Sequence, residues 1–221
     1  ELGLKQHFNT RVDSLKAVLA KEYDAVFVGT GAPRGSDLEL PGRKDAAANI
    51  FVGIDWLSSV SFEHVSKIGK RVLVVGMGNS AMDIASELAQ RPMAEKLFVS
   101  TRRGVWIFPK YYRGQPLDKN PAPAWLPKGI KQWLGARMVK GLVGKMSDYG
   151  LPEPEIGPFE SHGTVSGEFL VRAGSGDINM KPAVERLDGD GVVFPDGSRE
   201  KVDVIVWATG YDISFPFFDD P

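Results

Sequence analysis

Residues 70–89 read KRVLVVGMGNSAMDIASELA. The apolar run before Gly76 is typical of a buried β-strand, and the glycine-rich turn after it ends the strand. Apolar residues then recur at helical spacing, at Met82, Ile84, Ala85, Leu88 and Ala89. The stretch therefore predicts a strand, a tight turn and a helix in succession.

A second strand is predicted just after this helix. Residues 96–100, KLFVS, form the next apolar run, so strand, helix and strand make a βαβ unit of about 30 residues. Strands joined in this way pair in parallel through a right-handed crossover. These segments predict an α/β protein with a three-layer Rossmann-type domain.

The glycine turn has the composition of a dinucleotide-binding turn. Gly76 permits a tight turn, Gly78 leaves room for a pyrophosphate, and Ala81 lets the helix pack closely against the strand. A helix that begins near Asn79 and Ser80 directs N–H groups and its positive dipole end at the phosphates. Because Gly-x-Gly is common, an ordinary strand-to-helix turn is the alternative interpretation. We predict that these five residues bind the phosphates of a nicotinamide cofactor.

Two arginines follow the second strand and indicate which cofactor binds. NAD sites usually carry an acidic residue there for the ribose 2′-hydroxyl, whereas this chain has Arg102 and Arg103. Guanidinium groups bind a 2′-phosphate through charge-assisted hydrogen bonds, each contributing roughly 1.5 to 3 kcal/mol. The sequence thus predicts a preference for NADPH, and a solvated strand end is the alternative.

Further elements are predicted along the chain. They are a helix over residues 12–19, a buried strand over 24–29, an irregular excursion over 105–127, a helix over 128–146, and strands over 192–194 and 202–207. The boundaries of an apolar segment over 50–57 cannot be fixed from the pattern.

Composition narrows the class of protein. The chain has 221 residues, 43% of them hydrophobic and 25% charged, which are the values of an ordinary globular protein. The net charge of −1 argues against nucleic-acid binding, and the absence of cysteine excludes disulfides, thiolate catalysis and iron–sulfur ligation. Three scattered histidines make a histidine metal site improbable, so no metal is predicted. With no leader and no long apolar run, the expected location is the cytoplasm.

Longer runs of the chain resemble two related flavoprotein families. The first 79 residues resemble the small subunit of glutamate synthase, through YDAVFVGTGAP at residues 23–33, LPG at 40–42 and GIDWL at 53–57. Residues 72–218 resemble flavin-containing monooxygenases, through GNSA at 78–81, STRRG at 100–104, SGDI at 175–178 and ATGY at 208–211.

The resemblance implies cofactors and a domain plan. Both families have an FAD domain into which an NADPH domain is inserted. It implies FAD-domain segments over residues 1–45 and 208–221 and an NADP-binding domain over residues 46–207. Two Thr-Gly pairs, Thr30–Gly31 and Thr209–Gly210, resemble the crossing points between these domains and are predicted cofactor-site residues.

Parts of the family patterns are absent. No Gly-x-Gly-x-x-Gly precedes Gly76, so we expect an incomplete FAD site and a chain that looks like a middle piece. In the monooxygenase signature Phe51 and Gly53 fit, but Leu57 stands at the histidine position. No residue is assigned a catalytic role.

Three functional interpretations follow. The favoured one is the NADPH-binding part of a flavin-dependent monooxygenase that oxygenates a soft nitrogen or sulfur nucleophile in a small-molecule substrate. The second is NADPH-to-FAD electron transfer, as in the glutamate synthase small subunit. The third is a noncatalytic NADP-binding module or an inactive fragment.

Residues 120–147 contain no acidic residue, although five lysines and arginines accompany the apolar stripe of the predicted helix over 128–146. Such a helix can lie weakly on an anionic membrane or on a partner. The alternative, which the sequence favours, is a helix packed over the core with its lysines in water. A homo-oligomer is also compatible with the sequence.

Overall fold

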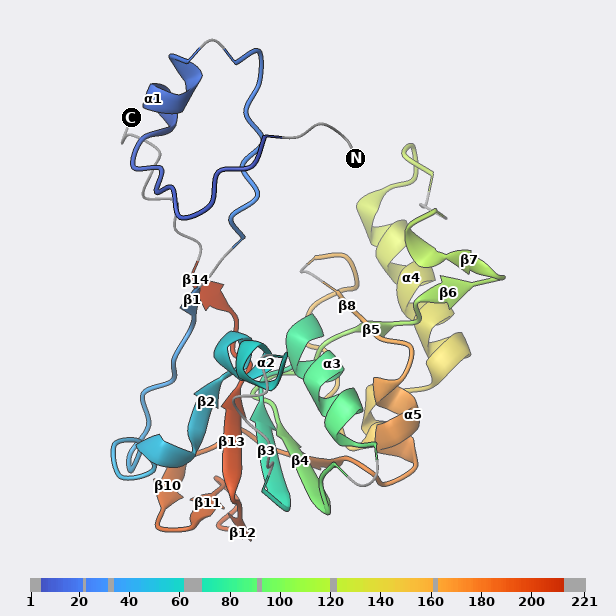
Figure 1. Ribbon diagram of the computed structural model, residues 1–221. Helices are drawn as coiled ribbons and strands as arrows, with labels where there is room; N and C mark the ends of the chain where they lie inside the picture. The colour runs from blue at the N-terminus through green and yellow to red at the C-terminus, as the bar shows by residue number, and fades with distance from the viewer. Residues whose placement is uncertain are drawn as a thin grey trace. The chain divides into compact units, whose positions relative to one another are not determined.

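The structure is a computed structural model that describes residues 5–21, 23–31, 34–61, 69–90, 93–119, 123–160 and 163–212. The chain forms two compact units (Figure 1). One comprises Glu1–Arg34 with Tyr211–Pro221, and the other comprises Gly35–Gly210. The short strands β1 (Arg34–Gly35) and β14 (Tyr211–Asp212) form a two-stranded sheet.

The first unit contains one short helix among its described residues. Helix α1 (Leu15–Leu19) begins where the Ala17 backbone N–H donates to the Ser14 hydroxyl, at 3.3 Å. The buried strand predicted over residues 24–29 is wrong, because this segment is irregular and the Phe27 side chain is 95% exposed. An apolar run forms a strand only where a neighbouring strand completes its hydrogen bonds, and no described strand pairs with this one.

A five-stranded sheet organises the second unit. Its strands run in the order β2-β13-β3-β4-β9 and every neighbouring pair is parallel (Figure 1). The strands are β2 (Ile50–Val52), β3 (Arg71–Val75), β4 (Lys96–Ser100), β9 (Asn179–Lys181) and β13 (Val204–Trp207). The parallel pairing predicted for β3 and β4 is confirmed, and so is the α/β class.

Alternation along the strands produces two cores. In β3, Val72 and Val74 face one core, while Leu73 and Val75 face the other. The first core lies under helices α2 (Gly53–Ser61), α3 (Asn79–Leu88) and α5 (Phe169–Gly174). Both faces of the sheet are therefore covered, as the continuous apolar sequence of β3 requires.

The second core lies under an antiparallel sheet. It consists of β10 (Arg186–Asp188), β11 (Gly191–Val193) and β12 (Arg199–Lys201), in that order. Leu187 and Val192 from this sheet pack with Phe98 and Trp207 from the parallel strands. Helices thus cover one face of the parallel sheet, and this antiparallel sheet covers the other face as the third layer.

A long excursion separates β4 from β9. It contains β5 (Ile107–Phe108), β6 (Tyr111–Tyr112), β7 (Gln115–Pro116), α4 (Lys128–Val143) and β8 (Thr164–Val165), with 3-10 turns at Leu117–Lys119 and Met146–Tyr149. A further 3-10 turn, Ala47–Asn49, lies before β2, outside the excursion. The helix predicted over 128–146 is confirmed for residues 128–143, but most of its apolar stripe is exposed. Gly135 and Val139 are buried, whereas Trp133 is 61% exposed. Within the part of the chain that the structure describes, no helix is both long and apolar enough to cross a membrane.

Candidate functional site

The glycine turn lies at the carboxyl end of β3, between its two neighbours in the sheet. Val75 is in register with Ser100 of β4 and with Trp207 of β13. The Gly76 backbone N–H donates to the Ser100 carbonyl at 3.0 Å. The ends of three parallel strands therefore meet at this turn, and such edges are where open α/β sheets bind ligands.

Gly76 is required by the backbone. Its φ is +132°, and a Cβ at this position would lie 2.2 Å from the Ala208 carbonyl oxygen. Neither the conformation nor the space admits a side chain. The tight turn predicted at this residue is confirmed, and the close neighbour is the strand end after β13.

Gly78 has the opposite surroundings. Its φ of −82° suits any residue, and a Cβ there would have no atom within 4 Å. It is the N-cap of α3, no side chain caps the helix there, and the first turn carries no acidic residue. An uncapped helix start beside open space matches what an anionic pyrophosphate requires, so the turn fits a dinucleotide.

Three further predicted residues lie in the first turn of α3. Asn79 is exposed, Ser80 is half-buried and Ala81 is fully buried against the sheet. The small side chain of Ala81 allows this close packing, as predicted from the sequence. Phosphate binding by Asn79 and Ser80 stays a prediction.

The two arginines follow β4 at the same edge of the sheet. Arg102 and Arg103 are both exposed, and among the described residues neither guanidinium takes part in an ion pair. Thr101 anchors the loop, since its backbone N–H donates to the Lys181 carbonyl at 3.1 Å and its hydroxyl to the Arg103 carbonyl at 2.8 Å. The backbone of this arginine loop, residues 101–104, is therefore fixed at the same edge of the sheet as the glycine turn, and the two cationic side chains have their charges in solvent.

Gly104, just after the arginines, is a close contact that the sequence did not single out. A Cβ there would lie 2.3 Å from the Pro152 carbonyl oxygen and 2.4 Å from that of Glu153. The hydrogen bond from the Ser147 backbone N–H, at 2.9 Å, holds the pKa of Glu153 below its usual value, although burial opposes the shift. The arginine loop thus rests on a fixed part of the excursion.

The Thr-Gly pairs lie in different units. In the second unit, the Thr209 hydroxyl donates to the Ser36 carbonyl at 2.7 Å, and the Ser36 backbone N–H donates to the Gly210 carbonyl at 2.9 Å. These bonds tie residue 36 to the segment after β13. In the first unit, Thr30 and Gly31 are exposed, and Gly31 has a φ of +67°. Their part in a cofactor site stays a prediction.

Strand β8 contacts the glycine turn, and sequence reasoning missed this contact. The Thr164 hydroxyl donates to the Met77 carbonyl at 3.1 Å, and the Val165 backbone N–H donates to the Asn79 side-chain oxygen at 3.0 Å. Thr164 lies 87 residues from Met77 along the chain, so no local pattern points to this pairing.

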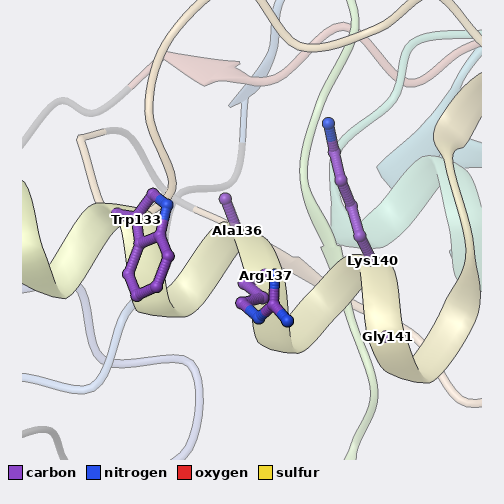
Figure 2. A pocket seen from close by; sticks show the side chains of 5 residues that line it. All are labelled: Trp133, Ala136, Arg137, Lys140 and Gly141. Carbon is purple, nitrogen blue, oxygen red and sulfur yellow. The ribbon is translucent and has the colours of Figure 1, made fainter.

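Helix α4 presents a shallow basic and aromatic surface. A hollow of about 520 Å³ is lined by Trp133, Ala136, Arg137, Lys140 and Gly141, all on this helix (Figure 2). The Arg137 guanidinium lies 5.9 Å from the centre of the Trp133 ring, and the Lys140 ammonium lies 5.9 Å from that of Trp106. We call these five residues the α4 surface.

Comparison with known proteins gives a family match over most of the chain. The family model "Flavin-binding monooxygenase-like" matches residues 11–221. This match includes most of the N-terminal third, the part that the sequence analysis compared with the glutamate synthase small subunit.

Two curated relatives from Rattus norvegicus are similar to this chain. Dimethylaniline monooxygenase (N-oxide-forming) 2 is 36% identical over 210 residues, and flavin-containing monooxygenase 5 is 32% identical over 209 residues. In both cases the alignment covers 90% of this chain and 38% of the relative. The chain thus spans well under half the length of these relatives.

Solved structures share the fold at low identity. Cyclohexanone monooxygenase with bound ε-caprolactone matches with a TM-score of 0.62 and 17% identity, over 83% of this chain and 47% of that one. An oxidised steroid monooxygenase bound to NADP matches with a TM-score of 0.54 and 17% identity, over 82% of this chain and 46% of that one.

Proposed function

The chain belongs to the flavin-binding monooxygenase-like family, and from this premise we propose that it forms the NADPH-binding part of a flavin-dependent monooxygenase. The observation that carries the proposal is the open, uncapped start of α3 at Gly78, beside two exposed arginines at the end of the next parallel strand. We assign the NADP-binding domain to residues 46–207 and the FAD-domain segments to residues 1–45 and 208–221.

Each residue of the turn has a role in this proposal. Gly76 closes the turn against the segment after β13, and Gly78 admits the pyrophosphate to the helix start. Asn79, Ser80 and Ala81 supply the backbone N–H groups of the first helical turn. Thr30–Gly31 and Thr209–Gly210 are assigned to the crossings between the cofactor domains.

The arginines select the cofactor. Arg102 and Arg103 bind the 2′-phosphate that distinguishes NADPH from NADH, because planar guanidinium groups match phosphate oxygens in pairs. When bound, NADPH supplies hydride to FAD, which supplies the oxygenation of a soft nitrogen or sulfur nucleophile. The chain's own contribution is to bind and orient NADPH for that transfer.

The proposal is tested by cofactor discrimination. Replacing Arg102 and Arg103 with alanine should weaken NADPH binding about tenfold or more and leave NADH binding nearly unchanged, as measured by titration calorimetry. Arg186→Ala, an exposed arginine on β10 in the other layer, is the matched control. Equal losses for the two cofactors would refute the assignment.

The reaction is tested on the full-length protein. With a tertiary amine or a sulfide, a monooxygenase consumes O2 and NADPH together and forms an N-oxide or S-oxide. An electron-transfer protein of the glutamate synthase type would instead reduce dyes without such a substrate. Substrate-dependent uptake of O2 in step with NADPH supports the proposal, and dye reduction alone contradicts it.

We propose further that the α4 surface makes weak contact with anionic lipid. Trp133 is largely exposed, Arg137 lies beside it and Lys140 follows further along the helix, a combination that suits the interface of a negatively charged membrane (Figure 2). Co-sedimentation with phosphatidylserine vesicles at low salt, lost in Trp133→Ser, supports the contact. If the parent protein does not co-sediment with the vesicles, the alternative holds, in which the helix packs over the core with its lysines in water.

A homo-oligomer and a cytoplasmic location stay predictions of the sequence.

A further inference from the structure

Strand β8, which belongs to the excursion between β4 and β9, is hydrogen-bonded to the glycine turn. Thr164 is only 3% exposed, and its hydroxyl donates to the Met77 carbonyl at 3.1 Å. The next residue, Val165, donates its backbone N–H to the Asn79 side-chain oxygen at 3.0 Å. The two hydrogen bonds are therefore made to Met77 and Asn79, the residues on either side of Gly78.

Strand β8 is itself fixed to the segment that follows the arginines. It pairs in parallel with β5, whose Ile107 and Phe108 are buried. The Thr164 backbone N–H donates to the Trp106 carbonyl at 3.1 Å. A Cβ on Gly163 would lie 2.2 Å from the Phe108 ring, so β8 packs tightly against β5. The arginine loop, β5, β8 and the glycine turn thus form one connected set of contacts.

The Thr164 hydroxyl determines how one peptide group of the turn is oriented. A trans peptide is planar, and its carbonyl and N–H point in opposite directions. The Met77 carbonyl and the Gly78 N–H belong to the same peptide group. Because Thr164 holds the Met77 carbonyl, the Gly78 N–H must point away from Thr164. If this peptide group were flipped, the carbonyl would take the place of the N–H on that opposite side. A carbonyl repels a phosphate, whereas an N–H attracts it.

We propose that Thr164 is a positioning residue for NADPH, acting through the Met77 carbonyl and, together with Val165, through the Asn79 side chain. This inference rests on the proposed binding of NADPH at the glycine turn. The Asn79 side-chain oxygen is occupied by Val165, so that oxygen holds the turn in place. The excursion between β4 and β9 therefore helps to form the cofactor site.

Two variants and two ligands test the proposal in the full-length protein. Thr164→Val keeps the shape of the side chain and removes the hydroxyl, and Thr164→Ser keeps the hydroxyl. The ligands are NADPH, which reaches both the arginines and the turn, and adenosine 2′-monophosphate, which lacks the pyrophosphate. Circular dichroism checks that each variant keeps its fold.

We expect Thr164→Val to raise the dissociation constant for NADPH about fivefold or more and that for adenosine 2′-monophosphate less than about twofold. Thr164→Ser should restore NADPH binding to within about twofold of the parent protein. Equal weakening of both ligands would assign Thr164 a merely structural role and overturn the proposal, as would unchanged NADPH binding. If the parent protein fails to bind NADPH, the proposed function fails with it.

A measurement on the parent protein covers the case in which Thr164→Val does not fold. Hydrogen–deuterium exchange of the peptide over residues 163–168 should slow when NADPH is bound and stay unchanged with adenosine 2′-monophosphate. Bound NADPH without slower exchange would overturn the proposal.

Discussion

At the scale of single residues, Gly76 and Gly78 differ in the room available at the position where a Cβ atom would lie. Gly76 lies against the Ala208 carbonyl in a backbone conformation that other residues avoid. Gly78 has an ordinary φ and open space where its side chain would be. The first glycine is therefore needed for the fold, and the second is free to serve a ligand.

Gly76→Ala should destabilise the protein by about 3 kcal/mol or more, because backbone strain and displacement of the Ala208 carbonyl add together. Urea denaturation followed by circular dichroism measures the loss. Gly210→Ala is the control, since Gly210 has a φ of +114° but no atom within 4 Å of its Cβ position, so only strain applies. If both variants lose the same stability, the contact with Ala208 contributes nothing.

Gly78→Ala should leave stability nearly unchanged and weaken NADPH binding about tenfold or more, because its methyl group occupies the space assigned to the pyrophosphate. Thermal melting and titration calorimetry measure the two effects separately. Tight NADPH binding by this variant would place the phosphates elsewhere.

The sequence predicted this turn because its signal is local. A strand, two glycines and a helix start are adjacent in the chain, and their geometry follows from backbone sterics. The contact of Thr164 with Met77 was missed because it depends on how a long excursion folds back. Asn79 was assigned to the phosphates, and only the structure reveals that its side-chain oxygen accepts a hydrogen bond from Val165.

At the scale of elements, a carboxylate joins the beginnings of β3 and β13. The Arg71 backbone N–H donates to the Asp203 carboxylate at 2.8 Å, and the Asp203 backbone N–H donates to the Arg71 carbonyl at 2.8 Å. The Arg71 guanidinium also pairs with this carboxylate. These bonds hold the pKa of Asp203 below its ordinary value of 3.8, with the Arg71 side chain as the main cause and burial opposing it.

Asp203→Asn should lower the melting temperature at pH 7 by about 2 to 4 °C. Because the pKa is lowered in the folded state, the stabilisation is fully present above the ordinary pKa of 3.8 and is lost as the pH falls through the folded value. The melting curves of parent and variant should therefore converge in acid. Asp83→Asn, on the exposed face of α3, is the control that should change little. A difference that persists unchanged at acid pH would contradict the ionic origin.

Elements were predictable where burial and periodicity agreed. Strands β3, β4 and β13 are buried on both sides and read as apolar runs, and α3 buries a regular stripe. The run over 24–29 reads in the same way, yet no described strand pairs with it. On α4 the apolar spacing suggested a buried stripe that includes Trp133, but Trp133 is exposed, and the helix contacts the core through Val139, with Met138 and Val143 packed beside it. Hydrophobicity alone does not reveal which neighbour will cover a side chain.

At the scale of the whole molecule, the chain divides into two compact units, whereas the predicted assignment of cofactors to domains stays a prediction. Both hydrophobic cores and the whole parallel sheet lie within Gly35–Gly210. So do the glycine turn, the arginines and Thr164. The FAD-domain segments, by contrast, were assigned from family resemblance alone and fall mostly outside this unit.

A protein consisting of residues 35–210 should fold cooperatively, bind NADPH and retain no FAD. It should fold because it keeps both cores, and it should bind NADPH because it keeps the turn and the arginines. Urea denaturation, NADPH titration and flavin absorbance after gel filtration measure the three properties. Bound flavin that bleaches when NADPH is added without oxygen would show that the unit contains a working flavin site, and the proposed division of cofactors between the segments would then be wrong.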